Sequence, residues 1–209
     1  MRQFVSITIC VSLCWASNAF ADPIPLLNAD FESNSGTNVG DPLDGWMPNG
    51  GIADHATFAR PNNGTLGAFF GFYSAGTTET VGQLTGEVYQ PNLIYTFRGW
   101  ANGGGDFVGT VPFQLGYAAT DDDLSSFVEL ATTTYDVGEP WADLAGVTYA
   151  TGAAGPEIGR QLIVRFGDGA AGGASDIWFD NLSASVVPEP ASMVLAILGA
   201  TALLRRRRR

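Results

Sequence analysis

Short runs of alternating residues, each closed by turn-forming residues, constrain the fold of this chain more than any other feature. The stretch 93–101, LIYTFRGWA, follows a Pro-Asn pair and precedes three consecutive glycines. Within it, Tyr95 and Phe97 alternate with Arg98 and Trp100. A period of two is typical of a β-strand that buries one face, and Pro, Asn and Gly close such strands with turns.

The same pattern recurs between residues 22 and 187, where no long helical periodicity occurs. Many short strands at this spacing favour an all-β fold, an antiparallel β-sandwich or jelly roll. The length of about 166 residues fits one domain, which we place at 22–186. The expected strands are 24–31, 55–60, 67–74, 79–89, 93–101, 111–119, 126–136, 144–150, 160–167 and 175–186.

Residues 1–21 have the three parts of a secretory signal peptide. A positive charge at Arg2 precedes an apolar run, and Ala19-Phe20-Ala21 supplies the small residues around a cleavage site. Both cysteines of the chain, Cys10 and Cys14, lie in this segment. The segment predicts export, and the mature protein is then expected to contain neither a disulfide nor a cysteine-bound metal.

The charge of the exported part is strongly negative. Residues 22–187 hold four arginines, no lysine and 20 of the 21 acidic residues, a formal net charge of −16. Such a surface repels nucleic acid and anionic lipid, so neither is an expected partner of the domain. It is compatible with solubility and with binding of divalent cations.

The last expected strand contains an irregularity. In SDIWFDNLSASV, Ile177 and Phe179 share one phase of the alternation, whereas Leu182 and Ala184 share the other. If both pairs face the core, a β-bulge near Asp180 absorbs one residue and changes the direction of that carboxylate. The alternative is a strand that is buried on both faces, with a tryptophan inside.

The first and last strands often lie side by side in jelly rolls, which would bring Glu32 and Asp180 together. Two adjacent carboxylates repel each other unless a cation or a proton lies between them. The oxygen ligands available here suit Ca²⁺, and Asn28 and Asp30 are weaker additional candidates. The alternative, that each acid is a solvated turn residue, stays open on the sequence alone.

Four stretches, LLNADFES, DGWMPNG, YQPNLIYTFRGWANG and DIWFDNLSAS, together resemble the galactose-binding-like jelly-roll domains. These domains include carbohydrate-binding modules and the domain of the cyanobacterial indole-alkaloid cyclases. The resemblance implies an antiparallel sandwich with a structural Ca²⁺ near the chain ends. By position, Glu32 and Asp180 match the acids of the short patterns that hold this ion.

The closing segment, residues 187–209, resembles the PEP-CTERM sorting signal. Its motif is Pro188, Glu189 and Pro190, followed by a short apolar run that is expected to be helical and by the cluster Arg205, Arg206, Arg207, Arg208 and Arg209. Residues 191–204 would span about 21 Å as a helix, which is short for a permanent membrane anchor. The resemblance implies an exosortase-type processing enzyme as partner, transient insertion in the inner membrane, and final placement at the cell surface or in the extracellular matrix of a bacterium.

Catalytic constellations are sparse, and no residue is assigned a catalytic role. There is one histidine, and nothing marks a nucleophilic serine near it. Sugar binding needs exposed aromatic rings, for which Trp46, Trp100 and Trp141 are candidates, with Arg98 beside Trp100. Each tryptophan has burial in the core as its alternative. The expected role is structural or adhesive, with exopolysaccharide as a possible contact, and the alternative is a secreted glycan-active or cyclase-like enzyme.

Overall fold

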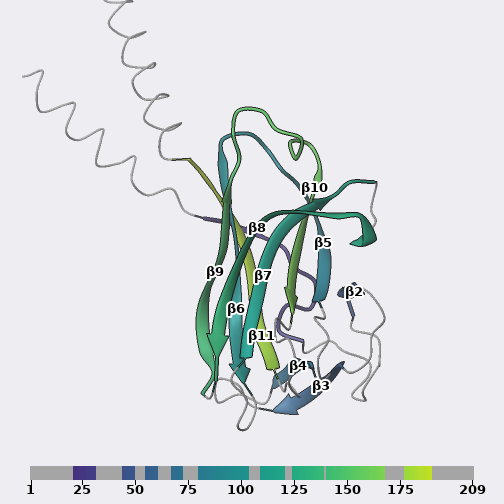
Figure 1. Cartoon of the computed structure of the whole chain (residues 1–209), viewed down its shortest axis with the longest axis vertical. Coiled ribbons are helices and arrows are strands. Elements are labelled where there is room, and N and C mark those ends of the chain that lie inside the picture. Colours follow the sequence, from purple (N-terminus) through teal and green to yellow (C-terminus); the bar gives the residue numbers. More distant parts are fainter. Residues whose placement is uncertain are drawn as a thin grey trace, which may run out of the picture.

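The computed structural model describes residues 21–31, 44–49, 55–60, 67–72, 80–103, 109–120, 124–138, 140–167 and 177–189. Within them the chain forms an all-β sandwich of two antiparallel sheets, as predicted (Figure 1). Residues 1–20 of the predicted signal peptide and the apolar and arginine parts of the tail lie outside the described residues. No helix in the described part is both long and apolar enough to cross a membrane.

Two sheets share the described strands. Sheet A has the order β3-β4-β11-β6-β9, and β1 also pairs with β11; sheet B has the order β2-β5-β10-β7-β8. The bounds are β1 Asp22–Ile24, β2 Met47–Asn49, β3 His55–Arg60, β4 Gly67–Phe72, β5 Thr80–Val88, β6 Leu93–Gly103, β7 Gly109–Ala118, β8 Phe127–Val137, β9 Ala142–Ala150, β10 Gln161–Gly167 and β11 Ile177–Pro188; a 3-10 turn, η1 Leu124–Ser126, precedes β8.

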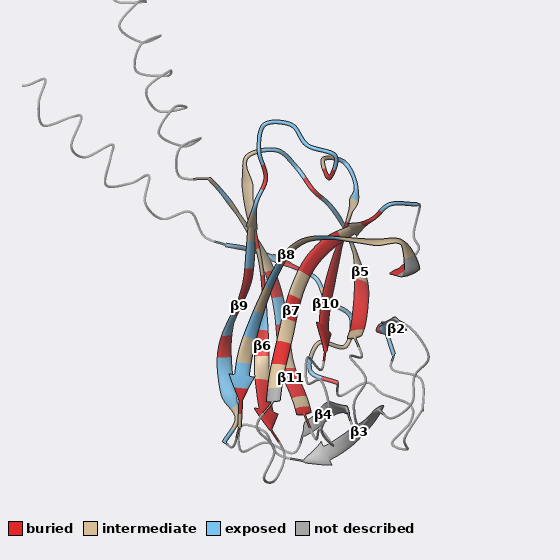
Figure 2. Ribbon diagram, in the orientation of Figure 1, coloured by how far each residue is buried: buried red, intermediate tan, exposed pale blue. Residues whose placement is uncertain are grey.

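The core lies between the sheets, where the alternating apolar residues of both sheets meet (Figure 2). Phenylalanine rings form its centre: the Phe113 ring lies 5.4 Å from that of Phe97 and 6.1 Å from that of Phe179, and the Phe166 and Phe179 rings are 4.6 Å apart. These four residues come from β6, β7, β10 and β11, so the aromatic contacts join the two sheets.

The predicted β-bulge in the last strand is confirmed. The register of β11 against β6 shifts between Asp180 and Ser183, and Asn181 takes a positive φ of 47°. Ile177 and Phe179 before the shift and Leu182 and Ala184 after it are all buried, whereas Ser183 is exposed. The strand is therefore not buried on both faces.

The predicted strand 24–31 is wrong. The strand there is β1, which ends at Ile24, and residues 27–30 form a turn. Asn28 and Phe31 have positive φ values of 47° and 56°, and the Phe31 N–H donates to the Asn28 carbonyl at 3.2 Å. Residues in this left-handed region cannot continue a pleated strand. The short strand β2 was not predicted.

A buried glutamine side chain holds this turn on sheet B. Gln83 of β5 is 2 % exposed. Its Oε1 accepts the Leu27 N–H at 2.8 Å, and its Nε2 donates to the carbonyls of Leu27 at 2.9 Å and Gly45 at 2.7 Å. The side chain therefore replaces the backbone partners that a strand would have provided, and it brings two loop segments onto one sheet.

Candidate functional site

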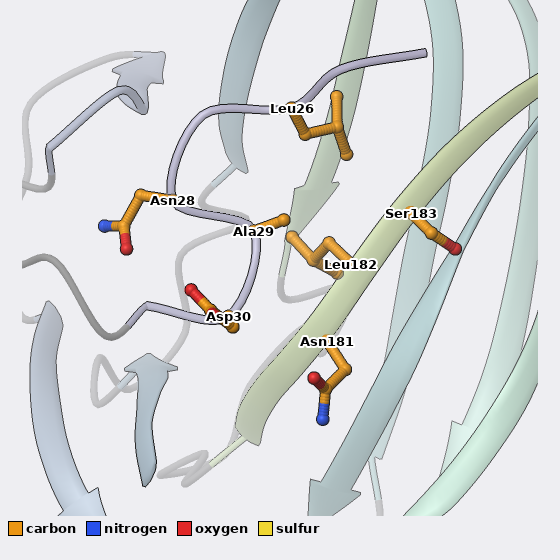
Figure 3. A pocket seen from close by; sticks show the side chains of 7 residues that line it. All are labelled: Leu26, Asn28, Ala29, Asp30, Asn181, Leu182 and Ser183. Carbon is orange, nitrogen blue, oxygen red and sulfur yellow. The ribbon is translucent and has the colours of Figure 1, made fainter. Parts of the chain in front are cut away.

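The first strand, β1, and the last strand, β11, lie side by side, as the sequence predicted. β1 pairs with residues 184–186 of β11, and β4 pairs with residues 177–179 along the same strand. Between these two pairings, the Leu182 N–H donates to the Ala29 carbonyl at 2.9 Å. An open depression of about 470 Å³ lies there, between the turn and the bulge (Figure 3).

The predicted calcium ligands are placed only in part. Asp180 is 3 % exposed, and its Oδ1 accepts the Asn181 N–H at 2.6 Å. Asn28 and Asp30 lie on the turn that faces β11, and the Asn28 amide donates to the Asp44 carbonyl at 3.2 Å. Glu32 lies outside the described residues. These side chains supply oxygen ligands of the kind that Ca²⁺ prefers.

The side chains around the depression do not converge on one point. Figure 3 shows Asn28 and Asp30 on the turn side, while Asn181 and Ser183 on β11 extend away from them. Within the part of the chain that the structure describes, no three His, Cys, Asp or Glu side chains lie close enough together to hold a metal ion. The acidic side chains of the described residues alone therefore do not form the predicted site.

The predicted sugar-binding residues lie together on sheet A. Arg98 and Trp100 occupy the outer-facing phase of β6, because the other phase, which includes Phe97, is buried in the core. Trp100 pairs in register with Asp143 of β9, and Trp141 lies two residues before Asp143. Trp100 and Trp141 are both half-buried, so neither ring is enclosed in the core.

An exposed ion pair joins this group, and the sequence reasoning missed its acidic member. Arg98 Nη2 donates to both carboxylate oxygens of Asp143, at 2.5 and 2.6 Å, and the two side chains are 45 % and 43 % exposed. Asp143 could have been identified only from the pairing of β6 with β9. The alternation of residues within one strand does not show which strand lies beside it. The pair presents a cation and an anion beside a tryptophan ring.

A second β-bulge lies opposite Arg98. The register of β6 against β9 shifts between Phe97 and Gly99, and Gly146 takes a positive φ of 76° there. A Cβ atom on Gly146 would collide with the backbone of Phe97, so glycine allows the two strands to approach closely. Bulges change the direction of neighbouring side chains, and this one lies at the strand position of the ion pair.

Trp46 is not available for a ligand. It is 3 % exposed, its ring lies 5.2 Å from that of Phe166, and its Nε1 donates to the Asn28 carbonyl at 3.1 Å. Of the two interpretations given for Trp46, burial in the core is therefore the one that the structure shows, because the loop that carries it folds into the core.

A tyrosine cluster surrounds a buried carboxyl group near the 151–160 loop. Glu157 is 3 % exposed, and the Tyr149 hydroxyl donates to its Oε1 at 3.2 Å. The Tyr89 ring lies 4.7 Å from that of Tyr95 and 6.0 Å from that of Tyr149. Burial raises the pKa of Tyr89 far above its ordinary value, and burial also raises the pKa of Tyr95 and Tyr149. The sequence reasoning did not identify this cluster.

Part of the tail motif belongs to the folded domain. β11 runs two residues past its predicted end at 186, so that Pro188 pairs with Leu93. The Glu189 N–H then donates to the Asn92 carbonyl at 3.0 Å. Pro190 and the residues after it lie outside the described part of the chain.

Comparisons with known proteins show the fold. No family profile and no curated protein match the chain. A cyclase from Fischerella sp. TAU matches with a TM-score of 0.64 at 18 % identity, over 81 % of this chain and 99 % of its own. A cyclase from the same organism in complex with 4-(1H-indol-3-yl)butan-2-one matches with a TM-score of 0.63 at 21 % identity, over 81 % and 99 %.

A carbohydrate-binding module is also similar. The CBM22-1 xylan-binding domain of Paenibacillus barcinonensis Xyn10C matches with a TM-score of 0.54 at 16 % identity, over 82 % of this chain and 99 % of that domain. At these identities the likeness establishes the architecture and not the activity. The chain shares a jelly-roll β-sandwich fold with these cyclases and with this carbohydrate-binding module.

Proposed function

We propose that the chain is an exported, non-catalytic surface or matrix protein whose sandwich binds exopolysaccharide through the outer face of sheet A. The observation that carries this proposal is the exposed Arg98–Asp143 ion pair beside Trp100. The similarity to a xylan-binding domain supports it as an analogy of fold.

The chemistry of the group suits a sugar. A pyranose ring has an apolar face, which packs on an indole ring. The hydroxyl groups at the edge of the pyranose donate and accept hydrogen bonds. Trp100 supplies the ring, while Arg98 donates and Asp143 accepts at the edge. Because the ion pair is exposed, it contributes about 0–1 kcal/mol to folding, so exchanging part of it for contacts with a ligand costs little stability.

Glycan binding by the full-length protein tests this proposal. Trp100→Ala should lower affinity for the bound glycan at least tenfold, because stacking on the ring is lost, and circular dichroism should show that the variant still folds. Thr148→Ala is the matched control, since Thr148 is an exposed side chain on β9 of the same sheet. Equal binding by the wild type and Trp100→Ala would refute the site, and no binding to any neutral glycan would refute the function.

We also propose that the ends of the chain direct it to the cell surface. Export by residues 1–21 is followed by transient insertion of the tail in the inner membrane and release by an exosortase-type enzyme. The supporting features are the Pro-Glu-Pro motif and the five terminal arginines, which favour a cytoplasmic end. Replacing all five arginines by glutamine should reduce the amount of protein in the surface fraction when cells are separated into membrane, surface and medium.

A structural Ca²⁺ at the chain ends is part of this proposal. Asp180 and Glu32, with Asn28 and Asp30 as weaker candidates, would hold it. The supporting observations are the buried carboxylate of Asp180 and the hydrogen bond that joins the 27–30 turn to the bulge. When bound, the ion would neutralise the carboxylates and link the first segment of the chain to the last strand. Its role would be structural.

A cyclase-like or glycan-active enzyme is the alternative. The observation that favours it is the buried Glu157 with its tyrosine neighbours, because enzymes use buried carboxyl groups beside aromatic rings in acid–base catalysis. A test compound is 4-(1H-indol-3-yl)butan-2-one, the ligand of one of the similar cyclases. The enzyme would be favoured over the binding protein by two results. The compound should raise the melting temperature of the wild type on binding, and the wild type should convert the compound to a product while Glu157→Gln does not.

A further inference from the structure

The end of β11 determines where the tail leaves the sandwich. Pro188 pairs with Leu93, and the Glu189 N–H donates to the Asn92 carbonyl at 3.0 Å. Figure 1 shows that β11 ends at the same end of the sandwich as the loop that joins β9 to β10. The tail therefore leaves the domain beside this loop and beside the turn that precedes β6.

A buried threonine holds the two loops together at this exit. The Thr151 side chain is fully buried, and its Oγ1 donates to the Gln90 carbonyl at 2.6 Å and accepts the Leu93 N–H at 3.0 Å. The Asn92 N–H also donates to the Gly152 carbonyl at 3.2 Å. Because these bonds join both loops, the tail leaves from a structured end of the domain.

The sequence leaves little chain between this end and the apolar run of the tail. Only Pro190 separates Glu189 from residue 191, where the run begins, and one extended residue spans at most about 3.6 Å. As a helix, residues 191–204 would span about 21 Å, against about 30 Å for the hydrocarbon core of a bilayer. A run that is shorter than the core thins the bilayer around it. An inserted tail would therefore hold this end of the domain in the headgroup layer.

The surface around the exit presents small apolar side chains. Residues 88–94 and 150–156 contain no charged residue, although the domain as a whole is strongly acidic. They include the exposed apolar residues Val88, Pro91, Ala153, Ala154 and Pro156, which we call the tail-end face. Glu87, Arg160 and Glu189 border this face. A neutral apolar face can approach lipid headgroups that would repel the acidic surface elsewhere on the domain.

The acidic side chain of the loop between β9 and β10 is buried. Glu157 is 3 % exposed, and the Tyr149 hydroxyl donates to its Oε1 at 3.2 Å. A Cβ atom on Gly155 would collide with this carboxylate, so glycine allows the loop to fold over it. The loop therefore buries its acid while Arg160 stays exposed. Burying a carboxyl group is unfavourable, and here it keeps a negative charge away from the end of the domain that the tail brings to the membrane.

We propose that the tail-end face is a docking surface for the phospholipid headgroups of the membrane that holds the uncleaved tail. This inference rests on the proposed function, because it assumes that the tail inserts in that membrane. The apolar side chains lie in the headgroup layer, and the exposed guanidinium of Arg160 binds a lipid phosphate. Such small side chains bury little apolar area, so their binding is weak without the tail. Cleavage of the tail would therefore also end the contact and release the domain.

Fluorescence quenching in vesicles tests the inference on the full chain with its tail uncleaved. The vesicles contain phosphatidylethanolamine and phosphatidylglycerol, with nitroxide on a fraction of the headgroups, and Cys10→Ser and Cys14→Ser leave no native thiol. A dye is attached to the new thiol of Ala154→Cys or, as the matched control, of Ala142→Cys; both are exposed alanines. Ala142 begins β9 and lies about 26 Å along that strand from its tail-side end. Quenching should be severalfold stronger in Ala154→Cys, and equal quenching in the two variants would overturn the proposal.

Two further measurements separate docking from tethering and from failure of the tail to insert. Val88→Glu adds a charge to the tail-end face and should weaken the quenching in Ala154→Cys severalfold, whereas Ala145→Glu, at an exposed alanine within β9, should not. Unchanged quenching in Val88→Glu would show a tether without docking and would overturn the proposal. Flotation of the vesicles measures insertion of the tail. A protein that floats but shows equal quenching refutes the docking alone, whereas a protein that does not float refutes the membrane step of the proposed function and the docking with it.

Discussion

Inserting one alanine directly after Asn181 should unfold the sandwich, because the bulge in β11 absorbs one extra residue and a second one reverses the phase of the strand. Asn181 lies in the register shift and has a φ of 47°. With a second extra residue, the residues on the two sides of the bulge can no longer both face the core. If Phe179 keeps its place, then Leu182 and Ala184, which are 4 % and 5 % exposed, turn to the outer face.

The expected loss is comparable to the whole stability of a domain. Exposing the Leu182 side chain costs about 1.5–3 kcal/mol, and the methyl group of Ala184 adds about 0.8 kcal/mol. Turning Ser183 and Ser185 inward without partners costs about 1–3 kcal/mol each. The sum of about 4–10 kcal/mol compares with about 5–15 kcal/mol for the unfolding of a typical domain.

Urea unfolding followed by circular dichroism measures this effect. The insertion variant should lack a cooperative transition, or its free energy of unfolding should fall by at least about 4 kcal/mol. Asn181→Gly is the control and should stay within about 1 kcal/mol of the wild type, since glycine accepts a positive φ. An insertion variant that unfolds cooperatively within about 2 kcal/mol of the wild type would refute the reasoning, because β11 would then tolerate either phase.

Three other perturbations test separate features. Gln83→Leu should lower the free energy of unfolding by about 2–5 kcal/mol in urea titrations, because it leaves buried backbone groups of two loops without partners; an unchanged midpoint would contradict this. Tyr89→Phe should keep or raise stability at pH 7, since the buried hydroxyl has no partner among the described residues. The pKa of Tyr89 is raised in the folded state, so above its ordinary value of 10.0 the hydroxyl loses its proton more readily in the unfolded chain, and the free energy of unfolding of the wild type falls as the pH rises. Between pH 9 and 12 the free energy of unfolding should therefore fall less steeply in Tyr89→Phe, by about 1.4 kcal/mol per pH unit above 10. Chelation by EDTA should lower the melting temperature of the wild type but not of Asp180→Ala, with Asp143→Ala as the control that keeps the response; a wild type insensitive to EDTA would remove the calcium proposal.

Much of the sandwich was predictable because the period of two is a local property. The stretch around Tyr95 and Phe97 forms β6 as expected, and the change of phase between Phe179 and Leu182 located the bulge. Both predictions depend only on residues that are near in sequence, where the alternation of apolar and polar side chains determines which face is buried.

The features that were missed depend on contacts between distant residues. Gln83 reads as a polar strand residue, and its role appears only when Leu27, 56 positions away, lies beside it. Asp143 becomes a site residue only through pairing with the strand of Arg98. The alternation of β10 places Arg165 on the face opposite Val164 and Phe166, but its burial under neighbouring side chains depends on η1 and β8. Single-strand patterns contain none of this information.

The position of β11 inside sheet A determines how the domain resists pulling. β11 pairs with β6 along its length, from Ile177 opposite Gly103 to Pro188 opposite Leu93. A force applied at the C-terminal end of β11 and resisted by a ligand on Trp100 would act along these two antiparallel strands. Their hydrogen bonds, which lie across the strands, would then be sheared together and not peeled apart one by one. A domain held at its tail and bound through β6 therefore meets mechanical tension in its most resistant direction.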